Sequence, residues 1–298
     1  MKLRDRDHEV LCNKESFVES LSKELPSGTI RYSSKVVSFE ESAGFYKLVH
    51  LADGTILRTK VLIGCDGVNS IVSKWLGFKK PKFTGRYALR GSAFFNTIHG
   101  FEPKFMQFFG ERVRSGLLPC DNNTAYWFFT WTPSSQDQKE LVENPAKMKH
   151  ELDGLLASPL RYRPPWEILW GHISKGNVCV AGDALHPMTP DIGQGGCAAL
   201  EDGVVLARCL GEAISGAKDK PDVEGKEECQ RIEMGLKKYA KERRWRSFEL
   251  IATSHIVGII QQSGGRLMTS MRDKFFAVFL AGLLLKMVDF DCGSLSVS

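Results

Sequence analysis

The residues of this sequence best suited to chemistry lie in one run, from Asn177 to Asp202. The run opens with an apolar, partly β-branched stretch, Val178 to Ala181, which predicts a buried parallel strand. Gly182 and Asp183 come next, at the carboxyl end of that strand, where open α/β sheets bind their ligands. Because a carboxylate only accepts hydrogen bonds, Asp183 suits a polyol ligand that offers several O–H donors.

The loop after Asp183 is typical of a backbone that approaches a ligand closely. Pro187 and Pro190 stiffen it, and the run from Gly193 to Gly196 permits tight turns. A helix is predicted to follow, because apolar residues recur three and four positions apart, at Cys197, Leu200, Val204, Ala207 and Leu210. The first N–H groups of a helix have no partner within it and its dipole is positive there, so the loop is predicted to face negative charge. An ordinary strand–loop–helix connection without a ligand is the alternative interpretation.

The pattern Gly-Asp-Ala-x-His-Pro-x-x-Pro-x-x-Gly-Gln-Gly-Gly, which ends in Glu201-Asp202, resembles the second FAD motif of the flavoprotein aromatic hydroxylases, the class A flavin monooxygenases. The amino-acid sequence of this motif is most similar to the plant branch, which resembles salicylate hydroxylases and zeaxanthin epoxidase. The resemblance implies that Asp183 binds the ribityl chain of FAD and that the loop lies against the flavin ring. The cofactor-binding residues that it implies in this run are Gly182, Asp183, Pro187, Gly193, Gln194, Gly195 and Gly196.

A second strand end carries Asp66 and Gly67, directly after the buried run Val61 to Ile63. Taken alone, this pair would be a turn. Together with Asp183 it resembles the Asp-Gly motif of the same family, which is shared between FAD and the nicotinamide cofactor. Many members carry Arg six or seven residues after the Asp, whereas Val72 and Ser73 stand there in this chain, which weakens any expectation of pyrophosphate or nicotinamide contacts.

No G-x-G-x-x-G follows a strand in this sequence. In the family that fingerprint opens the protein and seats the FAD pyrophosphate and adenosine on a helix amino terminus. Glu15 also stands where members commonly carry Arg. We therefore expect a truncated form of the family's FAD domain, with an exposed sheet edge and weakened FAD binding.

The predicted fold class is α/β (α+β): a truncated Rossmann-like FAD domain with an inserted antiparallel β-sheet substrate domain and carboxyl-terminal helices. The expected segments are residues 1–79 (FAD-binding domain, first part), 80–170 (substrate-domain sheet), 171–212 (FAD-binding domain, second part) and 213–298 (helical region). The sheet is predicted from strands at 87–95, 105–110, 112–119 and 124–132. In the last of these, Tyr126, Phe128 and Thr130 alternate with Trp127, Phe129 and Trp131, so that one face could line a pocket or simply pack the core.

The remaining elements follow from periodicity and turn signals. They are a helix at 16–25, a strand at 29–39, hairpin arms at 45–51 and 55–63 joined through Asp53-Gly54, and a short helix to Leu76 capped by Gly77. Further along come a helical connector at 133–157, a loop at 211–225, a helix at 230–258 and an apolar helix at 275–285.

Composition and charge exclude several classes. The 298 residues are 43% hydrophobic with a net charge of +5, which implies no nucleic-acid footprint. The eight cysteines show no metal-ligand spacing and no disulfide pattern, and they favour a reducing interior. The longest apolar run is too short to span a bilayer, and the amino terminus has no signal core, so an intracellular protein, cytoplasmic or plastid, is expected.

By resemblance, the chain is an FAD- and NAD(P)H-dependent monooxygenase. It would insert one oxygen atom from O2 into a small organic substrate, aromatic or isoprenoid, through a C4a-hydroperoxyflavin. No residue is assigned a catalytic role; His186 is expected to form a local hydrogen bond in its loop. The alternative function is a non-catalytic remnant that binds FAD weakly or not at all. The sequence does not select the substrate, NADH or NADPH, or an oligomeric state.

Overall fold

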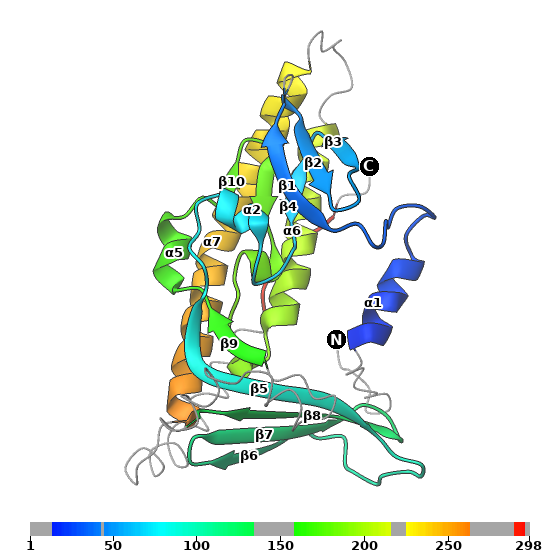
Figure 1. Ribbon diagram of the computed structural model, residues 1–298, viewed down its shortest axis with the longest axis vertical. Coiled ribbons are helices and arrows are strands. Elements are labelled where there is room, and N and C mark those ends of the chain that lie inside the picture. Colours follow the sequence, from blue (N-terminus) through cyan, green and yellow to red (C-terminus); the bar gives the residue numbers. More distant parts are fainter. Residues whose placement is uncertain (1–13, 43–44, 134–157, 216–224, 263–288, 296–298) are drawn as a thin grey trace. The chain divides into compact units, whose positions relative to one another are not determined.

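The computed structural model describes residues 14–42, 45–133, 158–215, 225–262 and 289–295 (Figure 1). The chain divides into two compact units. Unit 1 comprises residues 1–32, 83–160 and 260–270, and unit 2 comprises residues 33–82, 161–259 and 271–298. The predicted helical connector at 133–157 falls almost wholly outside the described residues, and the apolar helix predicted at 275–285 falls outside them altogether.

Unit 2 contains a three-stranded sheet in the order β10-β11-β4, formed by Ser174–Lys175, Val178–Val180 and Leu62–Gly64. β11 is parallel to β4, with Val178 opposite Leu62 and Val180 opposite Gly64. All three β11 residues are buried. The predicted buried parallel strand at Val178 is therefore confirmed.

The expected second hairpin arm from Thr55 to Ile63 is wrong as a single strand. β3 (Ile56–Thr59) pairs with β2 (Lys47–Leu51), whereas β4 belongs to the other sheet. The break has a physical cause, because the Asn177 side-chain amide donates to the carbonyl of Lys60 at 2.5 Å and to that of Phe45 at 2.7 Å. These bonds turn the chain from one sheet into the next.

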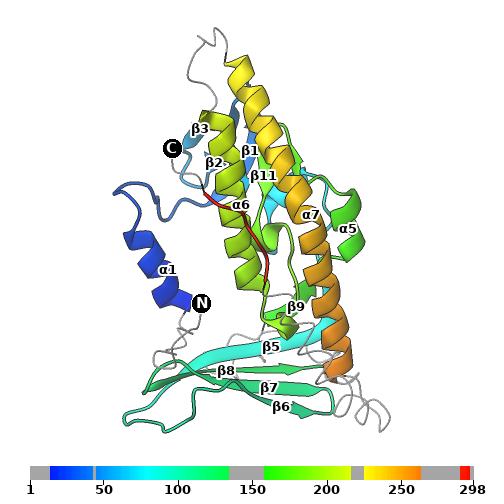
Figure 2. The ribbon, with the colours of Figure 1, turned by 180° about the vertical axis from the view of Figure 1, so that it is seen from behind.

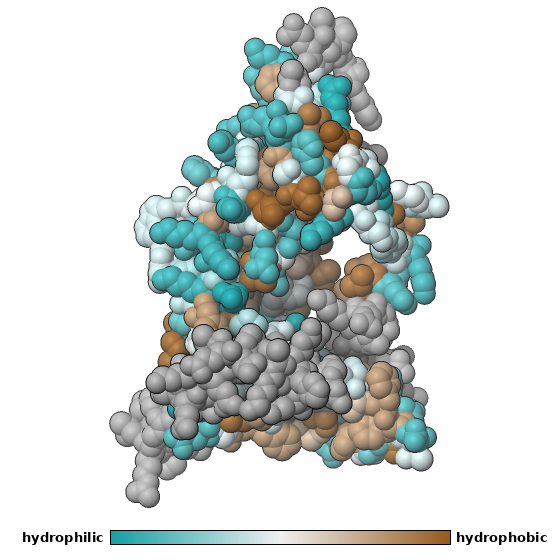
Figure 3. Space-filling model, viewed as in Figure 1, coloured by the Kyte–Doolittle hydropathy of each residue, from teal (hydrophilic) through white to brown (hydrophobic). Residues whose placement is uncertain are grey.

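The second sheet of unit 2 is antiparallel, in the order β1-β2-β3, with β1 at Val36–Glu41. The strand predicted from residue 29 begins only at Val36, because Ser33 adopts a positive φ of 54° that interrupts extended backbone. The predicted Asp53-Gly54 turn is confirmed, with Gly54 at φ 83°. Figure 3 shows hydrophobic residues gathered over this sheet, where Val37 and Ile56 are exposed.

Two long helices lie side by side, α6 (Gly195–Ser215) and α7 (Lys226–Gln262), and unit 2 contains all of α6 and residues 226–259 of α7 (Figures 1 and 2). Their buried residues and β11 form one hydrophobic core, which includes Val205, Cys209, Leu236 and Tyr239. The helices predicted after Gly196 and at 230–258 are confirmed, although α7 is longer at both ends. α6 also continues to Ser215, beyond the predicted start of a loop.

Shorter elements complete unit 2. α2 (Ile71–Trp75) begins after Ser70, whose hydroxyl accepts the Ser73 N–H at 2.8 Å, and α5 covers Pro165–Trp170. The segment 289–295 runs beside α6 in Figure 2. Its Phe290 ring lies over the guanidinium groups of Arg243 and Arg246, at 4.8 and 4.9 Å.

The main feature of unit 1 is a five-stranded sheet in the order β6-β7-β8-β5-β9. Its strands are β5 (Lys82–Phe94), β6 (Met106–Gly110), β7 (Val113–Pro119), β8 (Thr124–Trp131) and β9 (Ser158–Tyr162). β8 pairs antiparallel with β5 and β7, so the predicted antiparallel sheet is confirmed, although the sequence did not predict β9. Helix α1 (Lys14–Lys23) begins two residues before its predicted start.

The register of β8 separates its aromatic side chains onto opposite faces. Trp131 lies opposite both Tyr87 and Val113, and its ring stacks on that of Tyr87 with centroids 5.7 Å apart. On the other face, Thr130 lies opposite Ala88 and Arg114. The predicted alternation is confirmed. None of the described helices is both long and apolar enough to cross a membrane.

Candidate functional site

The carboxyl ends of β4 and β11 bring the two predicted acidic residues to the same edge of a sheet. The strands are parallel neighbours, and the Ala181 N–H donates to the Gly64 carbonyl at 3.0 Å just beyond the last paired residues. From there the chain continues into Asp66 on one strand and Asp183 on the other, and both residues are exposed. Two carboxylates from distant parts of the sequence therefore reach solvent at one sheet edge.

Asp66 is held against the start of α2. Its Oδ2 accepts the Ile71 N–H at 2.8 Å, while Gly67 adopts a positive φ of 78° that favours glycine. β4 and α2 are packed tightly, because a Cβ added to Gly64 would lie 2.5 Å from the Val72 Cβ. Val72 thus has a packing role at one of the positions where the resembled family often carries Arg.

Asp183 lies in a tight turn, Gly182–Ala184, that follows β11. Gly182 has a φ of 59°, and its carbonyl accepts the N–H groups of Leu185 and His186, both at 2.9 Å. Asp183 is exposed, whereas the residues that flank this turn are buried. The turn therefore presents one carboxylate to solvent from an otherwise buried segment.

The loop that follows leads directly into the first turn of α6. A short 3-10 turn, Pro190–Ile192, ends at Gly193 with φ 67°, and the Ala198 N–H donates to the Gln194 carbonyl at 2.9 Å. The first turn of α6 contains no acidic residue. Its positive dipole end is thus left to attract negative charge from a ligand.

Within the described part of the chain, no contact requires Gly195 or Gly196 to be glycine. A Cβ on Gly196 would meet no atom within 4 Å, and one on Gly195 would meet only the Met188 Cγ, at 3.9 Å. Glycine at both positions leaves open space in front of a helix amino terminus. Such a cradle, next to two exposed carboxylates, fits a ligand that combines hydroxyl groups with a planar ring that accepts negative charge, as FAD does.

Pro187 differs from the other predicted cofactor-binding residues because it is buried. Its carbonyl accepts the N–H of Arg163 at 2.9 Å. It therefore supports the loop from within the protein in this structure.

A buried charged network beneath the loop was not predicted. Asp202 has no exposed surface; its Oδ2 accepts hydrogen bonds from Gly182 N at 2.7 Å and from His186 Nε2 at 2.8 Å, and its Oδ1 accepts from Arg243 Nε at 2.6 Å. Burial alone would raise the pKa of Asp202, but these three partners together hold the pKa below its usual value. The expectation of a local hydrogen bond for His186 is wrong, because its partner lies 16 residues away on α6.

A second buried cation, Arg163, was also not predicted. It donates to the Ser73 hydroxyl at 2.8 Å and to the carbonyls of Leu185 and Ala184 at 2.9 and 3.1 Å. Burial lowers the pKa of Arg163 to about 10, against the opposing effect of Glu167. Ser73, the other position at which the resembled family often has Arg, therefore binds an arginine from elsewhere in the chain.

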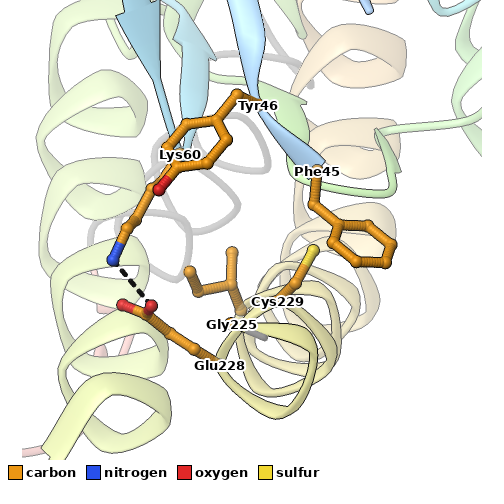
Figure 4. Close-up of a pocket in the computed structure, with 7 residues that line it drawn as sticks. Phe45, Tyr46, Lys60, Gly225, Glu228 and Cys229 are labelled. Carbon is orange, nitrogen blue, oxygen red and sulfur yellow. Dashed lines mark hydrogen bonds and ion pairs between the residues drawn. The ribbon is translucent and has the colours of Figure 1, made fainter. Parts of the chain in front are cut away.

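A small pocket lies elsewhere in unit 2, where the first turn of α7 meets the start of β2 and the end of β3 (Figure 4). Its lining residues are Phe45, Tyr46, Lys60, Gly225, Glu228, Cys229 and Ile232. Lys60 and Glu228 form an ion pair across it at 2.6 Å. Its volume of about 40 Å³ is far below the few hundred that a cofactor needs, so it is not the cofactor site.

Exposed carboxylates at neighbouring strand ends and a glycine-lined helix start are typical of an α/β protein that binds a cofactor. A family model described as an FAD binding domain matches residues 18–232. Monooxygenase 2 of Arabidopsis thaliana is 55% identical over 309 residues, which cover 97% of this chain and 76% of that protein. Monooxygenase 1 of the same plant is 34% identical over 306 residues, 96% of this chain and 77% of that protein. The chain therefore belongs to the FAD-dependent monooxygenases.

Solved structures share the fold. HpxO of Klebsiella pneumoniae, complexed with FAD and uric acid, matches with a TM-score of 0.64 at 24% identity over 87% of this chain and 67% of that one. A salicylate hydroxylase in complex with its substrate matches with a TM-score of 0.61 at 18% identity, over 94% and 76% of the two chains. The predicted fold class and the resemblance to class A flavin monooxygenases are both confirmed.

Proposed function

We propose that this protein uses NAD(P)H and O2 to insert one oxygen atom into a small organic substrate, with FAD bound at the sheet edge that carries Asp66 and Asp183. The observation that supports this function best is that Asp66 and Asp183 follow the carboxyl ends of neighbouring parallel strands, while the open amino terminus of α6 follows Asp183 in the chain. A ligand with a polyol chain and an electron-accepting ring matches each part of that arrangement.

The proposed roles follow from the chemistry of each group. Asp183 accepts hydrogen bonds from ribityl hydroxyls, while Asp66 and Gly67 line the neighbouring strand end. The loop from Gly193 to Gly196 would let the backbone approach the flavin ring, and the first turn of α6 would stabilise negative charge on that ring. FAD supplies the redox chemistry and oxygen activation when bound. The protein residues orient the cofactor and set its electrostatic surroundings.

Unit 2 contains all of these residues, so we assign FAD binding to it and substrate contact to the sheet of unit 1. An aromatic substrate is favoured by the aromatic face of β8, where Trp131 stacks on Tyr87. Relatives named for hydroxylating urate support the same class. An isoprenoid is the second class of substrate that the plant resemblance suggests.

The first experiment is a titration of the purified chain with FAD, followed by visible absorption, for the wild type and an Asp183→Asn variant. Loss of the carboxylate should weaken FAD binding about tenfold, because an acceptor for ribityl hydroxyls becomes a mixed donor and acceptor. The control is Glu249→Gln, which changes an exposed carboxylate on α7 and should bind FAD as the wild type does. Equal affinity in all three proteins would contradict the role of Asp183.

The second experiment measures NAD(P)H oxidation and O2 consumption by the FAD-loaded protein with salicylate, urate and a carotenoid as trial substrates. Substrate-stimulated oxidation with a hydroxylated or epoxidised product would support the proposal and choose between the substrate classes. A wild-type chain that stays colourless at high FAD would support the non-catalytic alternative instead.

A further inference from the structure

The Asp202 carboxylate is the point at which three separate parts of unit 2 meet. It lies on α6, and it accepts hydrogen bonds from the Gly182 backbone, from the His186 ring and from Arg243 on α7. The first two partners belong to the turn and loop that carry Asp183. One buried carboxylate thus determines where the end of β11 lies relative to both long helices.

Arg243 extends the same network to the other half of the site. Its Nη2 donates to the Ala198 carbonyl at 3.1 Å, and its Nη1 donates to Glu201 at 2.8 Å. Arg246 binds both oxygens of Glu201, at 2.7 and 3.0 Å. Ala198 lies in the first turn of α6, so α7 holds the helix start and, through Asp202, the Asp183 turn.

The network contains matched charges with almost no access to water. Asp202 and Arg243 have no exposed surface, and the side chains of Arg246 and Glu201 are 6% and 12% exposed. Two carboxylates face two guanidinium groups. A buried network of this kind often adds little net stability compared with apolar residues of the same volume, whereas it fixes relative positions and charges closely.

We propose that Asp202 is a positioning residue for the flavin site: it locks the Gly182–Asp183 turn against α6 and supplies a fixed negative charge behind the turn that carries Asp183. This inference rests on the proposed function, since it concerns how the same site holds FAD. Asp202 itself is buried beneath the turn, and it acts on the cofactor only through the backbone of Gly182 and through its charge.

The Asp202→Asn variant separates these roles from simple packing. The amide has nearly the same shape, but its NH2 group must take either the position that faces Arg243 Nε or the position that faces both Gly182 N and His186 Nε2. At least one hydrogen bond of the network is lost, and the balance of two negative and two positive charges shifts to one net positive charge. We expect FAD affinity to fall at least about tenfold. The reduction potential of the bound flavin should shift to a more positive value, because a negative charge near the reduced ring is removed.

The matched control is Glu212→Gln, which also neutralises a carboxylate on α6 but breaks an exposed ion pair with Lys238. It should leave FAD affinity and reduction potential unchanged. Weaker FAD binding with an unchanged reduction potential would mean that Asp202 only positions the turn, which would overturn the part of the proposal that concerns its charge. An Asp202→Asn protein with wild-type affinity and potential would overturn the proposal.

A measurement without any variant keeps the proposal testable if Asp202→Asn fails to fold. Amide hydrogen exchange of the FAD-free wild type should show the Gly182 N–H protected as strongly as the β11 core, because its acceptor is fully buried. Exchange at the rate of an open loop would overturn the positioning role. Absence of FAD binding by a wild type with a protected Gly182 would count against the proposed function alone.

Discussion

At the scale of single residues, the site depends on side chains that are buried as much as on those that face a ligand. Asp66 and Asp183 are exposed and available, whereas Asp202, Arg243 and Arg163 are buried and hydrogen-bonded. In the proposed function the exposed carboxylates bind the ligand, because a ligand can reach them. The buried groups serve position, because each joins segments that are distant in the sequence.

Arg163 allows the first prediction at this scale. Its planar guanidinium satisfies acceptors on Ser73, Ala184 and Leu185, and its charge centre lies 4.3 Å from the Phe78 ring. An ammonium group cannot reproduce this fork of donors. Arg163→Lys should therefore lower the free energy of unfolding by about 2 kcal/mol, as measured by urea denaturation. Arg161→Lys, two residues earlier and only half-buried, should change it by less than about 0.5 kcal/mol; an equal loss in both variants would contradict this role.

The second prediction concerns acid stability. Partners in the folded state hold the pKa values of Asp202 and Glu201 below 3.8 and 4.5, the values of the free side chains. A carboxyl group whose pKa is lower in the folded state contributes its full stabilisation at pH values above its pKa in the unfolded state. That stabilisation is lost as the pH falls through its pKa in the folded state. The free energy of unfolding should thus decline as the pH falls below about 4.5. Urea denaturation above and below this pH should show a smaller loss in the free energy of unfolding for Glu201→Gln than for the wild type. The same loss in variant and wild type would refute this.

At the scale of elements, the start of α6 combines weak helix formers with an open surface. Gly195 and Gly196 occupy helical positions where glycine costs stability relative to alanine. No contact among the described residues explains them, since a Cβ on Gly196 would meet no atom within 4 Å and one on Gly195 only the Met188 Cγ, at 3.9 Å. A cost in helix stability without a packing reason is typical of a functional position.

Gly196→Ala should therefore stabilise the protein and impair the site. The free energy of unfolding should rise by about 0.5 kcal/mol, while FAD affinity should fall about tenfold because the methyl group occupies the space proposed for the ring. Gly211→Ala is a matched control: Gly211 is also helical, exposed and without atoms near its Cβ position. It should stabilise equally and leave FAD binding intact. Chemical denaturation and absorption titration measure the two effects; unchanged FAD affinity in Gly196→Ala would contradict the proposed contact.

At the scale of the whole molecule, the two units have separate tasks in the proposed function. All the residues proposed to face FAD belong to unit 2, and the aromatic sheet belongs to unit 1. A ligand that binds only the folded state stabilises whatever part of the protein forms its site.

FAD at about 100 times its dissociation constant should stabilise unit 2 by about 2.7 kcal/mol, which raises its unfolding temperature by several degrees. Differential scanning calorimetry should show this shift for the wild type and a smaller one for Asp183→Asn at the same FAD concentration. If unit 1 unfolds in a transition of its own, that transition should not move. A wild-type thermogram that is unaffected by FAD would contradict binding.

Local pattern was sufficient to predict the strand ends, the glycine loop, the two long helices and the antiparallel sheet. Val178–Val180 reads as a buried strand because it is apolar, and Asp53-Gly54 reads as a turn because Gly54 needs a positive φ. Asp183 was singled out because it follows such a strand, and Asp66 because, together with Asp183, it resembles the Asp-Gly motif of the family. These features depend on residues that are close in sequence, where spacing and backbone preference are decisive.

Only the tertiary structure decided how these parts are held together. Asp202 and Arg243 lie 41 residues apart, and Arg163 lies 90 residues from Ser73, so no periodicity could join either pair. The break between β3 and β4 likewise depends on Asn177, which is more than 100 residues away. The physical reason is the same in each case. A buried polar group must find a partner when its neighbours exclude water, and which partner it finds is determined by the packing of the whole chain.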